Sequence, residues 1–263
     1  MIYHSTRKTA GFSLVELMIA LVAGLIVIGA VLAFTVSSVR ANSDFVKSTR
    51  LTQELRNTSD YIGAELKRAG YDENAMKYVA NPTSTDVSKF APILVDTTAG
   101  ANCIIYGYDR SPGSPGAVDY DNGEVRGIRR ATRLGVGVIE VAESTDTVTP
   151  TCAGAGPDYS QYPVTCNTST GWCSFSNQRT MNITTFTVNT AGSGTDSNGV
   201  RTLAGTTSFN ALQMREFQLT VAGNLVNDTT ITRTVRSNIK VRADCLRANL
   251  AAIATGCNAA PTP

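Results

Sequence analysis

Histidine is almost absent from this sequence: the single copy, His4, lies in the short basic segment before a long apolar run. The rest of the chain therefore cannot supply a Ser-His-Asp triad, a Cys-His pair or a histidine ligand for a metal ion. Acid–base catalysis would depend on carboxylates, Lys or Tyr alone. The sequence predicts a protein that is not an enzyme and that uses no cofactor and no metal.

The cysteines lack the spacing of a metal or redox centre, because no two of them form a CxxC motif. All six lie on the C-terminal side of the apolar run, and an even number in one compartment favours disulfides in an oxidising environment. The candidates are Cys103, Cys152, Cys166, Cys173, Cys245 and Cys257. The acidic stretch at 119–124, DYDNGE, lacks the spacing of an EF-hand and predicts a turn instead of a calcium site.

Net charge is also small, with 23 Lys and Arg against 21 Asp and Glu. Two of the basic residues, Arg7 and Lys8, precede the apolar run, so the remainder is neutral and has no global field to attract nucleic acid. Two basic clusters could still bind an anion such as DNA, but solvated faces or ion pairs between subunits are the favoured interpretation. They comprise Arg126, Arg129, Arg130 and Arg133, and Arg233, Arg236, Lys240 and Arg242.

The apolar run GFSLVELMIALVAGLIVIGAVLAF, residues 11 to 34, is long enough to cross a hydrocarbon core of about 30 Å. The basic residues before it predict a cytoplasmic N-terminus and an extracytoplasmic C-terminal part. A secretory signal cleaved near Ala41 is the alternative. The length of the run opposes that alternative, as does Glu16, whose carboxylate costs about 2.5 to 3.5 kcal/mol inside a bilayer.

Proline is absent between residues 12 and 69, which permits one continuous helix. Apolar residues then recur at helical spacing, at Leu51, Leu55, Ile62, Leu66 and Ala69, and predict an amphipathic second half that ends at a Gly70 cap.

Beyond residue 71 the chain is rich in Thr, Ser, Gly, Asn and Val and predicts β-structure. AVDYDNGEVRGIRR, with Asn122 and Gly123 at its turn, predicts a hairpin, and FTVNTAGSGTDSNGVRTL predicts two strands joined by a polar loop. The alternating residues of 217–221 and 231–241 predict a final strand pair with one face against the helix. Trp172 is either an exposed contact or a loop anchor.

The segment TAGFSLVELMIAL resembles the prepilin signature of type IV pilins and type II secretion pseudopilins. The resemblance implies that prepilin peptidase removes a leader, residues 1–11, after Gly11, and that the new N-terminal residue, Phe12, is N-methylated. It also implies that Glu16 pairs with the Phe12 amine of an adjoining subunit. Such a partner would offset the cost of a carboxylate in an apolar segment.

The long helix ending in LKRAGY, the β-rich domain and the closing strand TVRSNIKVRADC together resemble PilW-like minor pilins. The implied fold is α+β: a helix, membrane-spanning over 12–36 and amphipathic over 37–70, packed on a predominantly antiparallel sheet domain at 71–263. The implied function is a type IV pilus minor pilin that helps to initiate assembly or acts near the tip. A J-type pseudopilin of type II secretion and a membrane-anchored adhesin or binding protein are the alternatives.

The partners implied by this resemblance are prepilin peptidase, the major and other minor pilins, the inner-membrane assembly platform and, before assembly, membrane lipid. The chain would be a single-pass inner-membrane protein with its globular domain in the periplasm, and later part of the extracellular pilus. For the disulfides, Cys166 with Cys173 and Cys245 with Cys257 each close a short polar loop, which leaves Cys103 with Cys152. The C-terminal pair resembles the cysteine-bounded loop that ends many pilins.

Overall fold

The computed structural model describes residues 11, 13–76, 87–96, 102–110, 123–189, 200–201, 211–247 and 256–261. One helix, α1 (Leu14–Arg68), precedes all of the strands. The chain divides into two compact units, Met1–Lys47 and Ser48–Pro263, so that α1 contributes to both.

The helix is continuous over 55 residues, as the absence of proline predicts. Its last turn carries Lys67 and Arg68, whose positive charges suit the carbonyl end of the helix dipole. Gly70 follows with a φ of +79°, in the left-handed region where glycine is favoured, and its N–H donates to the carbonyl of Gly107. The predicted helix end is therefore confirmed.

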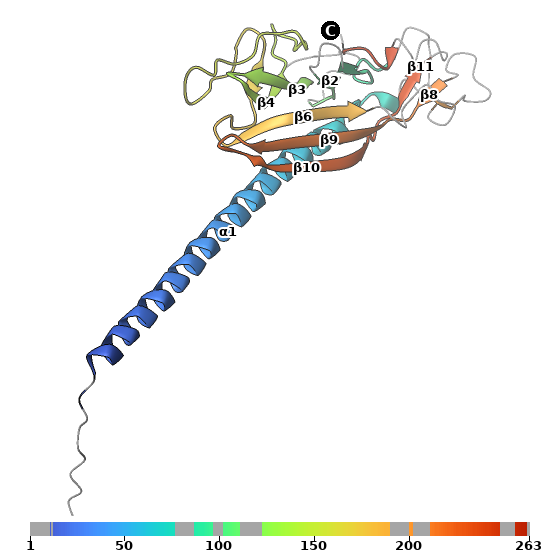
Figure 1. Cartoon of the computed structure of the whole chain (residues 1–263). Helices are drawn as coiled ribbons and strands as arrows, with labels where there is room; N and C mark the ends of the chain where they lie inside the picture. Colours follow the sequence, from blue (N-terminus) through green and yellow to red (C-terminus); the bar gives the residue numbers. More distant parts are fainter. Residues whose placement is uncertain are drawn as a thin grey trace, which may run out of the picture. The chain divides into compact units, whose positions relative to one another are not determined.

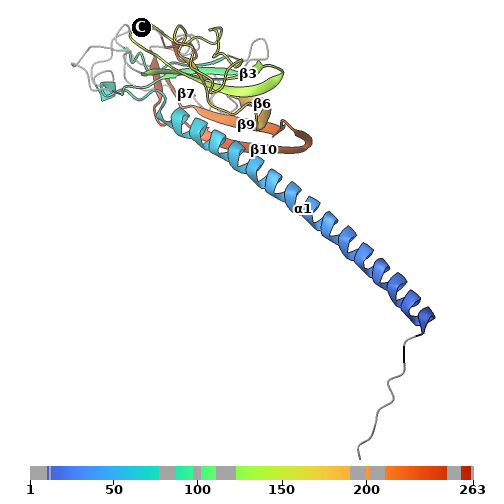
Figure 2. The ribbon, with the colours of Figure 1, turned by 90° about the vertical axis from the view of Figure 1, so that its left-hand side faces the viewer.

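The strands form three antiparallel sheets in the described part of the chain, in the orders β1-β2-β3-β4-β5, β10-β9-β6 and β11-β8-β7. Figures 1 and 2 both show β9 and β10 alongside the last turns of α1. The bounds are β1 (Ile93–Asp96), β2 (Cys103–Gly107), β3 (Val125–Arg133), β4 (Val136–Glu143), β5 (Trp172–Ser174), β6 (Met181–Asn189), β7 (Val200–Arg201), β8 (Ala211–Gln213), β9 (Glu216–Leu225), β10 (Asp228–Lys240) and β11 (Cys245–Arg247).

The main core lies between the C-terminal turns of α1 and the strands. All five apolar residues predicted on the helix face are completely buried, and they pack in one cluster with side chains of β9 and β10 such as Leu219 and Ile239. Ser59 and Ser237 hydroxyls meet 3.2 Å apart across the same contact. One long apolar helix packed on antiparallel sheets is thus an α+β, pilin-like architecture, as the sequence predicts.

The helix contact contains a glycine that leaves room for a methyl group. A Cβ at buried Gly63 would meet only Ile239 side-chain atoms at 3.8 Å. Because Ala is a better helix former than Gly, we expect Gly63→Ala to raise the free energy of unfolding by about 0.5 to 1 kcal/mol. Denaturant titration of the purified chain measures this.

Gly70→Ala is the matched control for Gly63→Ala. Its φ is positive, and its Cβ would lie 3.1 Å from the Arg215 guanidinium and 3.2 Å from the Ala243 methyl. We therefore expect a loss of about 1 kcal/mol or more. If Gly63→Ala lowers the unfolding midpoint as Gly70→Ala does, the helix–sheet contact is tighter than these distances indicate.

The hairpin predicted around Asn122 and Gly123 is wrong. Strand β3 pairs with β2 on one side and with β4 on the other, and Gly107 faces Val125 in the register, so neither side of β3 is free for a hairpin partner that turns at Asn122 and Gly123. The tight turn lies at Leu134 and Gly135, which have φ values of 49° and 81° and thus the type I′ signature. A Leu at the first turn position gives no turn signal, whereas Asn-Gly gives a strong one.

The other strand predictions are confirmed with one refinement. Strands β9 and β10 form the final antiparallel pair, with Val221 opposite Val235. The segment FTVNTAGSGTDSNGVRTL does supply two strands, β6 and β7, but they belong to different sheets. The stretch at 119–122, within the predicted acidic turn, lies outside the described residues.

Disulfides join Cys103 to Cys152, Cys166 to Cys173 and Cys245 to Cys257. These are the three pairs that the short-loop argument predicts. They indicate that the domain folds in an oxidising, extracytoplasmic compartment.

Candidate assembly site

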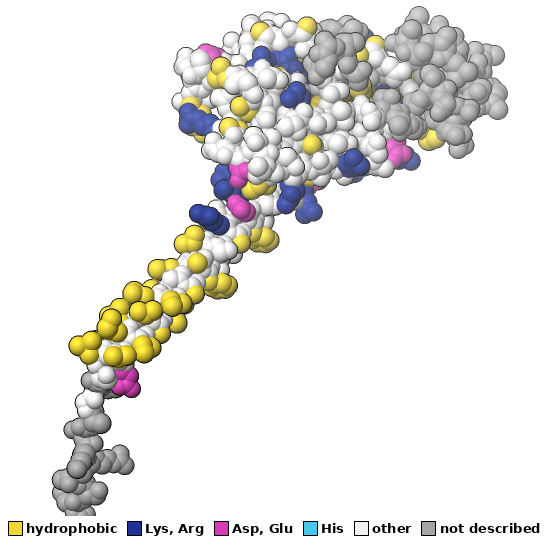
Figure 3. Space-filling view, in the orientation of Figure 1, with side chains coloured by type: hydrophobic (Ala, Val, Ile, Leu, Met, Phe, Trp, Pro, Cys, Tyr) yellow, Lys and Arg dark blue, Asp and Glu magenta, His cyan; other side chains and the backbone are white. Residues whose placement is uncertain are grey.

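In the described part of the first unit, α1 is apolar and its large side chains are exposed. Within α1, the most apolar window has a mean hydropathy of 2.9, none of it is buried, and the helix is long enough to span a bilayer. Figure 3 shows hydrophobic side chains covering the visible side of this segment. Large residues from Leu14 to Val39 are exposed, for example Ile26 at 67% and Phe34 at 75%. Such a surface needs lipid or other helices around it.

Glu16 lies in the first turn of this helix and is exposed. Gly11 is exposed as well, and a Cβ added to it would meet nothing within 4 Å. Phe12 and the leader residues 1–10 lie outside the described residues. Cleavage after Gly11, methylation of Phe12 and pairing of Glu16 therefore stay predictions.

Ser13 gives Glu16 a partner that the sequence analysis did not identify. The Ser13 backbone N–H donates to a Glu16 carboxylate oxygen at 3.4 Å, and the Leu17 N–H donates to the Ser13 carbonyl at 3.1 Å. Ser at the N-cap with Glu three residues later is the capping-box pattern, and a negative charge in the first turn suits the helix dipole. The S-x-x-E spacing in the sequence carried this signal.

The second basic cluster lies on and just beyond the outer strand β10. Arg233 donates to the Ser48 hydroxyl and to the Thr232 carbonyl, whereas Arg236, Lys240 and Arg242 are exposed. The interpretation as a solvated face therefore holds for these three residues.

Comparison with models of protein families shows the family of the chain. A model of the prokaryotic N-terminal methylation motif matches residues 6–32, which contain Gly11, Phe12 and Glu16. A second model, prepilin peptidase-dependent protein B, matches residues 44–241. The chain belongs to the prepilin peptidase-dependent protein B family. Comparisons with curated proteins and with solved structures gave no match.

Membership of the prepilin peptidase-dependent protein B family places the chain among pilin-like proteins, which are generally structural and not enzymatic. The family description implies processing by prepilin peptidase. The two matched models support the prediction that the chain is pilin-like. They do not show that it is of the PilW type.

In this prepilin peptidase-dependent protein, the first arginine cluster is not a solvated face. Arg126 is 9% exposed and its guanidinium lies 3.0 Å from the carboxylate of Glu65, a buried residue of α1. Tyr106 donates to the same Glu65 oxygen at 3.1 Å, and its burial, reinforced by the charge of Glu65, raises the pKa of its hydroxyl. These ion pairs are intramolecular, which corrects the expectation of pairs between subunits, and they tie α1 to β2 and β3.

A second buried group is centred on Glu140 of β4. Arg129 and Arg133 each form a salt bridge with its carboxylate, and the shortest N–O distance is 2.7 Å in both pairs. Arg129 also stacks over the Trp172 ring at 3.9 Å, and Trp172 is completely buried. Trp172 is thus an anchor in the core and not an exposed contact.

Loss of the Glu140 carboxylate should leave these arginines without their anion. Glu140 is 0% exposed and Arg129 is 4% exposed. We expect Glu140→Ala to lower the free energy of unfolding by about 3 to 5 kcal/mol, because an uncompensated charge stays buried. Glu143→Ala on the same strand is the control: its side chain is 53% exposed in its pair with Arg126, and we expect about 1 kcal/mol or less. Equal unfolding midpoints for the two variants would contradict this assignment.

Proposed function

We propose that this protein is a minor pilin of a type IV pilus, most like the PilW type. Prepilin peptidase cleaves after Gly11, Phe12 is N-methylated, and the processed chain enters the filament to initiate assembly or to act near its tip. Adhesion, motility or DNA uptake would follow from the filament. The methylation-motif match over an uncovered apolar helix supports this proposal most strongly.

The physical argument concerns what can surround the helix. Before assembly, lipid covers its apolar side chains, and the exposed carboxylate of Glu16 accepts the capping hydrogen bond of the Ser13 N–H at 3.4 Å. In a filament, helices of neighbouring subunits replace the lipid, and the amine of a neighbour's Phe12 becomes available as an ionic partner. The pairing compensates a charge that the apolar surroundings disfavour. The inner-membrane assembly platform and the other pilins are the partners that such a transfer requires.

A deletion strain complemented with the wild-type gene tests the proposal. We expect fewer surface pili in the deletion strain, recovery on complementation, and the processed, methylated chain in the sheared-pilus fraction by intact-mass analysis. An unprocessed chain would point to a membrane-anchored adhesin. A processed chain that affects secretion but not pili, with pseudopilins as its pulled-down neighbours, would point to type II secretion.

A further inference from the structure

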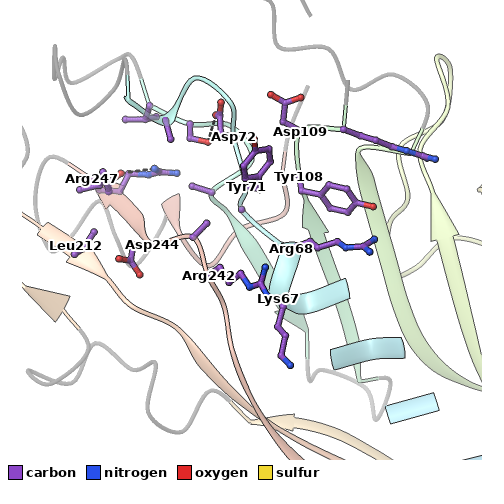
Figure 4. Close-up of a pocket in the computed structure, with 18 residues that line it drawn as sticks. Lys67, Arg68, Tyr71, Asp72, Tyr108, Asp109, Leu212, Arg242, Asp244 and Arg247 are labelled. Atoms are coloured by element: carbon purple, nitrogen blue, oxygen red, sulfur yellow. Dashed lines mark hydrogen bonds between the residues drawn. The ribbon is translucent and has the colours of Figure 1, made fainter. Parts of the chain in front are cut away.

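A cavity of about 850 Å³ lies beside the C-terminal end of α1 in the second unit. Figure 4 shows Lys67, Tyr71 and Arg242 among its lining residues, together with Leu212 and Arg247 from β8 and β11. Its volume is within the range of small-molecule sites.

Two buried arginines lie at or next to this cavity: Arg247 lines it, and Arg215 contacts two residues of its lining. Arg247 lines it at 8% exposure and donates to the backbone carbonyls of Leu246 and Gly256, each at 2.7 Å. Arg215, at 2% exposure, donates to the carbonyls of Ala91 and Ala243. Among the residues that the structure describes, neither guanidinium forms a salt bridge, and the Arg215 Nε has no hydrogen-bond acceptor.

Positive side chains outnumber carboxylates in the described lining: it contains Lys67, Arg68, Arg110, Arg242 and Arg247, against Asp72, Asp109 and Asp244. The carboxylates of Asp72 and Asp109 accept hydrogen bonds from neighbouring N–H and hydroxyl groups, and the negative charge of Asp244 acts on Arg215. Burial lowers the pKa of Arg215 to about 10, with the positive charge of Arg247 adding to that effect. Lys67 and Arg242 are part of that positive charge, and neither belongs to the ion pairs seen among the described residues.

Apolar groups complete the lining. Ala75, Val87, Ala91, Leu212 and Leu246 all contribute to it, so a ligand with an apolar body would bury surface there. A buried cation without an anion is costly, and a carboxylate placed near Arg247 and Arg242 would reduce that cost.

We propose that this cavity is a binding site for a carboxylate carried on an apolar body, with Arg247 at its inner side and Arg242 at its rim. The carboxylate belongs either to a side chain or chain end of a neighbouring subunit or to a free organic acid. The inference does not rest on the proposed function, because a membrane-anchored protein that never enters a filament would bind the same group.

Titration of the full chain, labelled with ¹⁵N-arginine and held in nanodiscs, tests the site. Butanoate is the probe, and butanamide is its neutral control of the same shape. We expect butanoate, but not butanamide, to shift the Nε–H signal of Arg247, which the Arg247→Lys variant assigns. Arg242→Gln should weaken the apparent affinity at least three-fold, whereas Arg233→Gln on β10 should leave it unchanged. Dispersed spectra show that each variant is folded.

Several outcomes would overturn the proposal: no shift with butanoate, an equal response to butanamide, or an affinity that Arg242→Gln does not change. A second measurement separates the two sources of the carboxylate. Tyr71, which is 56% exposed and lines the cavity, is replaced by p-benzoylphenylalanine in cells and irradiated. Crosslinks to another pilin-like subunit that Arg242→Gln abolishes identify a subunit carboxylate. Charge-dependent butanoate binding without such crosslinks identifies a free acid.

Discussion

Gly11→Asp should accumulate as uncleaved, membrane-bound precursor, with little or no mature chain. The resemblance to prepilins implies that the peptidase depends chiefly on the residue at this position, and the family description names dependence on that enzyme. An effect through misfolding is not expected, because a Cβ at Gly11 meets nothing within 4 Å. Intact-mass analysis and immunoblotting of the membrane fraction measure the processed share.

Gly29→Ala is the matched control for this variant. Gly29 lies within the apolar helix, and a Cβ there also meets nothing within 4 Å. We expect its processing to equal that of the wild type. Normal cleavage of Gly11→Asp would place the processing site elsewhere, as a secretory signal cut near Ala41 would require.

Glu16→Leu should be inserted and cleaved normally and yet be nearly absent from sheared pili. Removing an ionised group from an apolar helix makes insertion easier by an amount on the order of 2 kcal/mol. Assembly, by contrast, loses the carboxylate that would meet the amine of Phe12 in an adjacent subunit, and that amine is left in apolar surroundings. The precursor mass, the membrane fraction and the sheared-pilus fraction are compared in a deletion background.

The capping contact at Ser13 provides controls that separate two roles of this carboxylate. Glu16→Gln keeps an acceptor for the Ser13 N–H but removes the charge, whereas Ser13→Ala weakens the cap and keeps the charge. If ion pairing is what assembly needs, Glu16→Gln is as defective as Glu16→Leu and Ser13→Ala enters pili. The reverse pattern would assign Glu16 to helix capping, and wild-type levels of Glu16→Leu in pili would refute the pairing altogether.

Local patterns predicted much of the fold because they reflect local physics. The run without proline, the helical spacing of Leu51 to Ala69 and the alternation in β9 and β10 each depend on near neighbours in the sequence. The turn at Leu134 and Gly135 was missed because pairing of β3 with β2 and β4 decides the hairpin, and no local signal specifies those long-range partners.

The candidate sites also differ in how far apart their residues lie in the sequence. The motif around Gly11, Phe12 and Glu16 is contiguous and could be recognised from the sequence. The arginine clusters could be seen, but their partners could not: Glu65 lies 61 residues from Arg126 in the chain. The cavity combines residues from α1, β8 and β11, and the burial of Arg215 and Arg247 depends on how all three elements pack.

The buried contacts of Glu65 with Arg126 and Tyr106 also determine how the domain would carry a mechanical load. The apolar contacts from Leu51 to Ala69 lie in a row along the helix, and this ionic group is near the end of that row. Tension applied along α1 must therefore shear the whole row together and cannot peel it one contact at a time. We expect a domain built in this way to remain folded under forces that would unzip a hairpin pulled apart at its open end. Force spectroscopy can compare the unfolding force when the domain is pulled along α1 with the unfolding force when it is pulled across the strands.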